Sequence, residues 1–233
     1  MHADMFITKL VNDPQYYFFV VITIIVSIVL HELAHGWLAM RHGDRTPLLT
    51  GHMTANPLVH LGPFSLVALF LIGMAWGQMP IDPSRMRGRW AEAMVAAAGP
   101  ATNLLLMLVA LTGLGLWGRF GMESWLFGDG GGPAVWQQNL IWLLYIFGSV
   151  NLLLFVFNLM PVPPLDGSHI LANFSPGYAS LLSDPSKQQI WLFGFIGAFL
   201  VVRVLMEKLA FAVTEYVNLV AGNTLVWYFI ADP

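Results

Sequence analysis

The chain contains 233 residues, of which 57% are apolar and only 10% are charged, whereas about 25% of the residues in an ordinary soluble domain are charged. A domain with so many apolar residues would expose too much apolar surface to stay soluble, so we expect an integral membrane protein. The formal net charge of -3 is too small to indicate nucleic acid as a partner. Because cysteine is absent, any bound metal must be held by His, Asp or Glu side chains.

Four long apolar stretches are expected to form transmembrane helices, because each reaches the roughly 20 residues needed to cross a bilayer. They cover about residues 16–41, 90–118, 136–160 and 188–228, and polar residues between 203 and 208 interrupt the last one. Residues 61–76 form a shorter apolar piece that is marginal for a span and suits a re-entrant segment. Residues 46–60 combine prolines and a glycine with short apolar alternation, which indicates an irregular loop with one or two short strands.

These elements predict an all-α polytopic membrane protein with about four to five transmembrane helices, a re-entrant segment and a small β-like loop near residues 46–60. We expect a single membrane-embedded domain over residues 1–233, with a core at 16–172 and a C-terminal helical extension at 186–230. The first apolar run follows Asp4, Lys9 and Asp13 rather than a basic segment. It is therefore expected to be a retained span and not a cleaved signal peptide.

The first span contains an HExxH motif formed by His31, Glu32 and His35. Positions i and i+4 of a helix lie on one face, so both imidazoles can reach one metal ion. Glu32 lies about 100° around the helix axis from His31, where its carboxylate can act as a base without binding the metal. The alternative is a pair of histidines that simply pack in a helix bundle. Three ionisable groups inside an apolar run are costly, however, and favour a functional site.

A hydrolytic zinc site needs a third protein ligand and leaves a fourth position for water. Asp166 is the stronger candidate, because it follows a fully apolar helix and a proline-rich stretch, and because the start of a new helix stabilises a carboxylate. Glu92 is the other acidic residue beside an apolar span. Asp166 could alternatively be a simple helix N-cap, which is a common role for aspartate.

Two motifs together carry a family resemblance. The HExxH motif inside a first long span, followed by Asn158-Leu-Met-Pro-Val-Pro-Pro-Leu-Asp166-Gly at the end of a later one, resembles the site-2 protease family of intramembrane zinc metallopeptidases. Two further stretches, Asn56-Pro-Leu-Val-His60 and Ala98-Gly-Pro-Ala-Thr-Asn103, are similar to its small bacterial branch without PDZ or CBS domains. The similarity covers about residues 8–171.

The resemblance implies one Zn²⁺ ion bound by His31, His35 and Asp166, with Glu32 as the general base. The implied activity is hydrolysis of peptide bonds in or near transmembrane segments of membrane protein substrates, as in regulated intramembrane proteolysis. A non-hydrolytic membrane protein that binds or transports zinc is the alternative. Glu32 distinguishes the two, because a transporter has little use for a carboxylate that does not bind the metal.

The resemblance also implies roles for two asparagines. Asn158 would lie near the active site and support the tetrahedral intermediate, and Asn103 would help to hold the substrate. Each could instead make a hydrogen bond between helices. His60 recurs in this branch without a settled role. A strand edge within residues 46–60 could clamp an unwound substrate, and a regulatory membrane partner or a homo-oligomer remains open.

The metal site constrains the topology. Both histidines lie nearer the C-terminal end of the first span, and Asp166 can reach that end only if residues 61–76 enter the membrane and return. Re-entry gathers five arginines on the same side, at positions Arg41, Arg45, Arg85, Arg87 and Arg89. The positive-inside rule then places the active-site end at the cytoplasmic face of the cell (inner) membrane and the N-terminus outside.

Overall fold

A computed structural model of the chain describes residues 5–120 and 134–222. Every regular element within these ranges is a helix, and four are long and apolar enough to cross a membrane. They are α2 (Pro14–Arg41), α5 (Ala91–Phe120), α7 (Val135–Asn158) and α10 (Gln188–Ala221). The expected polytopic all-α membrane fold is therefore confirmed. The part of the last expected helix beyond residue 222 lies outside the described residues.

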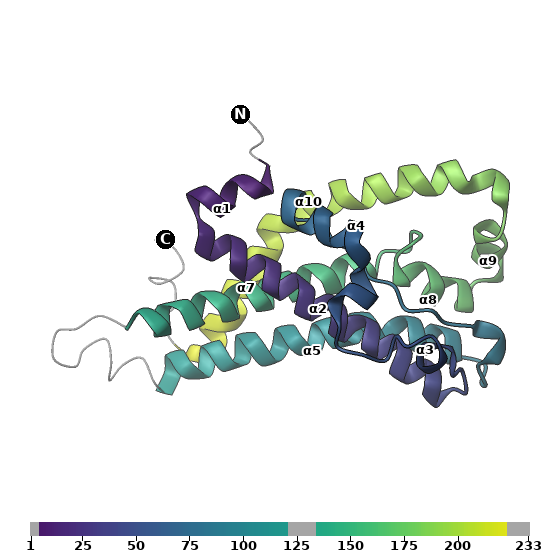
Figure 1. Ribbon diagram of the computed structural model, residues 1–233, viewed down its shortest axis with the longest axis horizontal. Coiled ribbons are helices and arrows are strands. Elements are labelled where there is room, and N and C mark those ends of the chain that lie inside the picture. Colours follow the sequence, from purple (N-terminus) through teal and green to yellow (C-terminus); the bar gives the residue numbers. More distant parts are fainter. Residues whose placement is uncertain (1–4, 121–133, 223–233) are drawn as a thin grey trace.

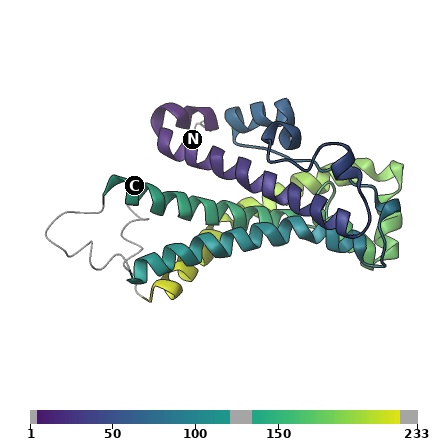
Figure 2. The same ribbon diagram turned by 60° about the horizontal axis from the view of Figure 1, so that its bottom comes forward.

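The four spans alternate in direction along the molecule (Figure 1). Helices α2 and α7 run toward the end that holds three short helices, and α5 and α10 start from that end. The turned view in Figure 2 shows α2, α5 and α7 side by side. We call the end with the short helices the site end. The short helices there are α3 (Thr46–Leu49), α8 (Asp166–Phe174) and α9 (Pro176–Leu182).

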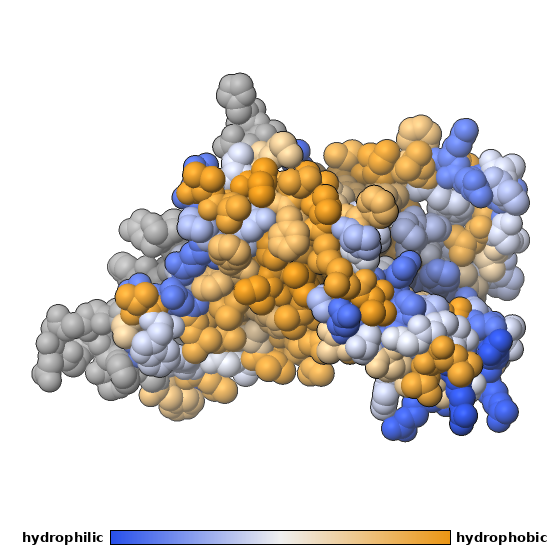
Figure 3. Space-filling view, viewed as in Figure 1, coloured by the Kyte–Doolittle hydropathy of each residue, from blue (hydrophilic) through white to orange (hydrophobic). Residues whose placement is uncertain are grey.

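The main hydrophobic core lies between α5, α7 and the C-terminal part of α10, and buries Leu111, Leu114, Ile141, Val213 and Val217. Figure 3 shows apolar residues over the middle of the molecule and hydrophilic residues gathered mainly at the site end. This distribution is typical of a protein with a bilayer around its middle. The domain limits and the division into a core and an extension remain predictions.

Helix α4 (Pro57–Ile72) is the short apolar segment. It runs along α2 in the opposite direction. Leu61 near its start packs by Val29, and Leu69 near its end packs by Tyr17. The chain turns at Gly73, which has a positive φ of 74°, a conformation that glycine adopts without strain.

The chain after α4 returns to the site end in an extended form. The Trp76 backbone exchanges two hydrogen bonds with the Ser65 hydroxyl, at 2.8 and 2.9 Å. The Gln78 N–H donates to the His60 carbonyl at 3.0 Å, and the Asp82 N–H donates to the buried Asp44 carboxylate at 2.8 Å. Helix α4 and the residues after it thus begin and end at the site end, which is what we expect if Asp166 is to reach the two histidines. We call residues 74–82 the return segment.

The expected strands within residues 46–60 are wrong, because this part of the chain forms α3 and turns before α4 begins at Pro57. The reason is local hydrogen bonding. Asp44 Oδ1 accepts from the Thr46 N–H and hydroxyl at 2.9 and 2.5 Å, and the Thr50 hydroxyl donates to the Thr46 carbonyl at 2.8 Å. Polar side chains that satisfy nearby backbone groups favour turns over strands.

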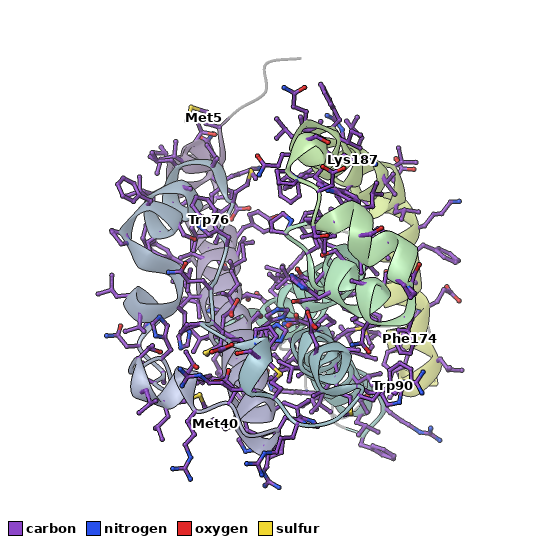
Figure 4. The ribbon with its side chains drawn as sticks, turned by 90° about the vertical axis from the view of Figure 1, so that its right-hand side faces the viewer. Met5, Met40, Trp76, Trp90, Phe174 and Lys187 are labelled. Atoms are coloured by element: carbon purple, nitrogen blue, oxygen red, sulfur yellow. The ribbon has the colours of Figure 1, made fainter. Side chains whose placement is uncertain are left out.

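Four smaller elements complete the part of the chain that the structure describes. Near its start, η1 (Phe6–Thr8) and α1 (Lys9–Asn12) precede α2, whose first turn is capped by Asp13 accepting from the Tyr16 N–H. η2 (Pro83–Arg85) follows the return segment, and η3 (Pro185–Lys187) precedes α10. The Trp90 and Phe174 rings stack at 4.8 Å and join α8 to the start of α5, as the end-on view in Figure 4 shows.

Candidate metal centre

Three predicted ligands converge where α2 meets the start of α8. His31 Nε2 lies 3.0 Å from His35 Nε2 and 3.1 Å from Asp166 Oδ2. His35 Nε2 lies 3.3 Å from Asp166 Oδ1. The two histidines are 8% and 5% exposed, so both imidazoles are enclosed by protein, while the Asp166 side chain is partly exposed. Because α2 and α8 are far apart in sequence, the fold of the whole bundle creates this cluster.

The hydrogen-bond partners of the two imidazoles determine where their protons lie. His35 Nδ1 is 2.7 Å from the Val95 carbonyl oxygen, and His31 Nδ1 is 2.6 Å from Asn103 Oδ1. Both oxygens can only accept, so each Nδ1 carries the proton and each Nε2 presents a lone pair. The lone pairs of two Nε2 atoms and a carboxylate therefore point at one another. A cation bound between them makes this arrangement favourable.

The geometry and chemistry of this group fit zinc. Ligands at about 2.0–2.1 Å from a tetrahedral zinc lie roughly 3.3 Å from one another, close to the separations of 3.0, 3.1 and 3.3 Å in this cluster. Asp166 Oδ2 is buried and accepts no hydrogen bond within the part of the chain that the structure describes. Three protein donors also leave a fourth position for water or substrate, as in hydrolytic zinc sites.

Glu32 lies beside the cluster on the same turn of α2 and is 8% exposed. It faces the return segment, and a Cβ added to Gly77 would overlap its Oε1 atom and come within 2.6 Å of Ile28 Cγ2. The carboxylate is thus held between the histidine turn and a close backbone. The other predicted ligand candidate, Glu92, instead pairs with His169 at 3.7 Å on the exposed surface of α5 and α8.

Helix α5 approaches the histidines through a glycine. A Cβ at Gly99 would overlap the Nε2 atoms of both His31 and His35. Only a residue without a side chain lets the backbone come so close to these rings. Sequence reasoning included Gly99 in a matching stretch without assigning it a function, and it missed Val95 because a backbone carbonyl leaves no signal in the residue type.

The two predicted asparagines lie in different environments. Asn103 is completely buried and lies in hydrogen-bond contact with His31, and its substrate-binding role remains a prediction. Asn158 is half-buried at the end of α7, where its Nδ2 donates to the Leu154 carbonyl of its own helix at 3.0 Å. The structure therefore brings Asn103, but not Asn158, into hydrogen-bond contact with the predicted ligands.

His60 is completely buried at the start of α4, and its Nε2 donates to the Thr54 carbonyl at 2.7 Å. The sequence offered no function for it. Its backbone carbonyl binds the return segment through Gln78, the residue that follows Gly77. His60 therefore helps to position the segment that covers Glu32.

Asp44 anchors the other end of the return segment. Burial alone would raise the pKa of its carboxyl, but hydrogen bonds from the Thr46 hydroxyl and from the N–H groups of Asp82 and Thr46 outweigh it and lower the pKa below its ordinary value. The carboxylate therefore stays ionised and holds residue 82 beside the end of α2.

Comparison of the amino-acid sequence with known protein families identifies one family that matches this chain. The family model for peptidase family M50 matches residues 18–124 and 116–204. No solved structure matches the chain.

Two curated proteins illustrate the relationship. The chain is 37% identical over 161 residues to "Putative zinc metalloprotease YwhC" of Bacillus subtilis (strain 168), covering 68% of this chain and 69% of the relative. It is 30% identical over 213 residues to "Putative zinc metalloprotease Rip2" of Mycolicibacterium smegmatis, covering 88% of this chain and 70% of the relative. The chain therefore belongs to peptidase family M50, the site-2 protease family, and is an intramembrane zinc metalloprotease.

Proposed function

We propose that the chain cleaves peptide bonds in or near transmembrane segments of other membrane proteins, at one Zn²⁺ ion held by His31, His35 and Asp166. The observation that carries this proposal is the convergence of three bare donor atoms within 3.3 Å, with Glu32 on the same helical turn. A site of this composition is suited to hydrolysis, because three ligands leave one position open.

The chain's own residues divide the chemistry between them. Bound zinc supplies a Lewis acid that polarises the scissile carbonyl and makes water more acidic. The Glu32 carboxylate accepts a proton from the attacking water and passes it to the leaving nitrogen. Because a transmembrane helix buries its peptide bonds in internal hydrogen bonds, the substrate must unwind locally before attack.

We further propose that the site lies shallowly beneath the cytoplasmic face. Trp37 is half-exposed with the Arg41 guanidinium 4.6 Å from its ring centroid, and Arg89 lies 4.5 Å from the exposed Trp90 ring. Tryptophans are enriched at membrane interfaces, and arginines on the cytoplasmic side. At 1.5 Å per residue, His31 is about 9 Å deeper along α2 than Trp37.

Cysteine labelling tests this orientation, because the chain contains no natural cysteine. Ser84→Cys places a thiol on the exposed site end, and Val11→Cys places one at the opposite end. In right-side-out membranes, an impermeant maleimide should label Val11→Cys and leave Ser84→Cys unlabelled until the membranes are opened. The reverse pattern would contradict the proposed orientation.

Glu32→Gln tests the catalytic proposal. The variant should lose proteolysis by about 10²–10⁴-fold, the usual contribution of a general base, and keep its zinc because Glu32 does not bind the metal. Glu92→Gln is the matched control, since it neutralises a carboxylate exposed at the start of α5 and should keep both properties. Full cleavage by Glu32→Gln would refute Glu32 as the general base. Zinc binding without any cleavage by the wild-type chain would instead favour the zinc-binding or transport alternative.

A further inference from the structure

A chain of buried hydrogen bonds leads from His31 across three spans. His31 Nδ1 is 2.6 Å from Asn103 Oδ1 on α5, and Asn103 Nδ2 donates to Asn151 Oδ1 on α7 at 2.9 Å. Asn151 Nδ2 then donates to two acceptors, the Phe147 carbonyl at 2.8 Å and the Ser27 hydroxyl at 2.9 Å on α2. Both asparagines and Ser27 are completely buried.

The Phe147 carbonyl, at the far end of this row of hydrogen bonds, determines which way each amide faces. The Phe147 carbonyl can only accept, so the amide nitrogen of Asn151 must face it and the amide oxygen must face Asn103. Asn103 must then present its nitrogen to Asn151 and its oxygen to His31. If Asn103 were turned over, two amide oxygens would meet in a buried site with no hydrogen between them, which is strongly unfavourable.

The orientation of the Asn103 amide determines which nitrogen of His31 carries the proton. An oxygen facing His31 Nδ1 requires the proton on Nδ1, and this leaves Nε2 free to bind a metal. We propose that Asn151 is a positioning residue that, by orienting the Asn103 amide against the Phe147 carbonyl, fixes the tautomer of His31 that binds zinc. The inference rests on the proposed role of His31 as a zinc ligand.

The two acceptors of Asn151 are not equivalent in this scheme. The Ser27 hydroxyl can donate or accept, so it cannot dictate which way the amide faces. The Phe147 carbonyl alone is sufficient to do so. Ser27→Ala should therefore have little effect on the His31 tautomer, whereas loss of the Asn151 amide should release it.

The experiment compares Asn151→Leu with the wild-type chain in detergent. Zinc affinity, measured by competition with a chromophoric chelator, should fall by about 10- to 100-fold, as is typical when a group supporting a metal ligand is lost. In zinc-free protein with ¹⁵N-labelled histidine at alkaline pH, the His31 signal should change from the Nδ1–H tautomer to a mixture of the two. Asn151→Ser, too short to reach Asn103, should behave in the same way and serves if the leucine variant does not fold.

A rescue and a control separate positioning from folding. Asn103→Asp offers His31 an acceptor whichever way its carboxylate turns, so adding it to Asn151→Leu should restore the tautomer and most of the zinc affinity. Tyr216→Phe removes another hydrogen bond between spans, from Thr112 to Tyr216 at 2.7 Å, and should leave zinc affinity unchanged.

The outcomes distinguish the inference from the proposed function. If the wild-type chain binds no zinc, the metal-site proposal itself fails. If wild-type and Asn151→Leu bind zinc equally and share the Nδ1–H tautomer, the positioning inference is wrong while the metal site stands. Equal loss in Asn151→Leu and Tyr216→Phe, without rescue by Asn103→Asp, would also overturn the inference.

Discussion

Substitution of Gly99 by alanine should weaken zinc binding without unfolding the bundle. The new Cβ would lie 2.5 Å from His31 Cε1, and real Cβ contacts below 3.0 Å are essentially never seen. The helix or the rings must therefore move by about half an ångström, more than the roughly 0.2 Å that a metal–ligand distance tolerates. Because both histidines are affected, we expect zinc affinity to fall by about 100-fold or more, which corresponds to about 2.8 kcal/mol.

Gly113→Ala is the matched control on the same helix, since a Cβ there meets nothing within 4 Å. Both substitutions raise helix propensity by up to about 1 kcal/mol, so the difference between them isolates the overlap at the metal site. Zinc affinity is measured by chelator competition and helical integrity by circular dichroism. Equal zinc affinity in the two alanine variants would refute the placement of α5 against the histidine rings.

Two further predictions concern the return segment. Gly77→Ala would place a Cβ 2.6 Å from Ile28 Cγ2 and in overlap with Glu32 Oε1. The kcat should therefore fall at least about 10-fold, which corresponds to about 1.4 kcal/mol of activation free energy, while the zinc content stays unchanged. An unchanged kcat would argue against this contact. Asp44→Asn weakens the charged anchor of residue 82. Hydrogen exchange of residues 77–82 should rise by about 10-fold or more, because a hydrogen bond to a charged group contributes about 1.5–3 kcal/mol. Because the pKa of Asp44 is lowered on folding, its stabilisation is complete above the ordinary value of about 3.9 and is lost as the pH falls through the folded value. Exchange corrected for intrinsic rates should therefore rise at low pH in the wild type but not in Asp44→Asn, and a parallel rise in both would contradict this anchor.

The sequence was most informative where a long apolar pattern or a rigid spacing decides the structure. The four spans follow from length and hydropathy, and the i, i+4 spacing of His31 and His35 puts both rings on one face of α2. The prediction that residues 61–76 enter the membrane and return to the same side followed from one requirement, that Asp166 reach the same metal. Each of these inferences needs only the length and hydropathy of one segment, or the requirement that two side chains reach one ion.

The remaining features depend on contacts that residue types do not specify. Residues 46–60 alternate like a strand, but the hydrogen bonds of Asp44 favour the short helix α3 at residues 46–49, and turns follow it. The residue type of Asn103 did not reveal that its amide lies between His31 on α2 and Asn151 on α7. Gly77 carried no sequence signal at all, because its importance lies in the proximity of Glu32, a contact created by the tertiary fold.

The row of buried polar groups on α2 has a consequence for biosynthesis. Thr23, Ser27, His31 and His35 recur at every fourth position and face the interior of the finished bundle. Among the four described spans α2 is made first, whereas Asn151 on α7 and Asp166 on α8 are synthesised only after α5. During translation this polar face therefore has no partners, and in a bilayer such groups are stabilised only once neighbouring helices or water satisfy them. The proposed zinc site cannot assemble until α8 has been made, so three of the four described spans are synthesised before the enzyme can cut any membrane protein.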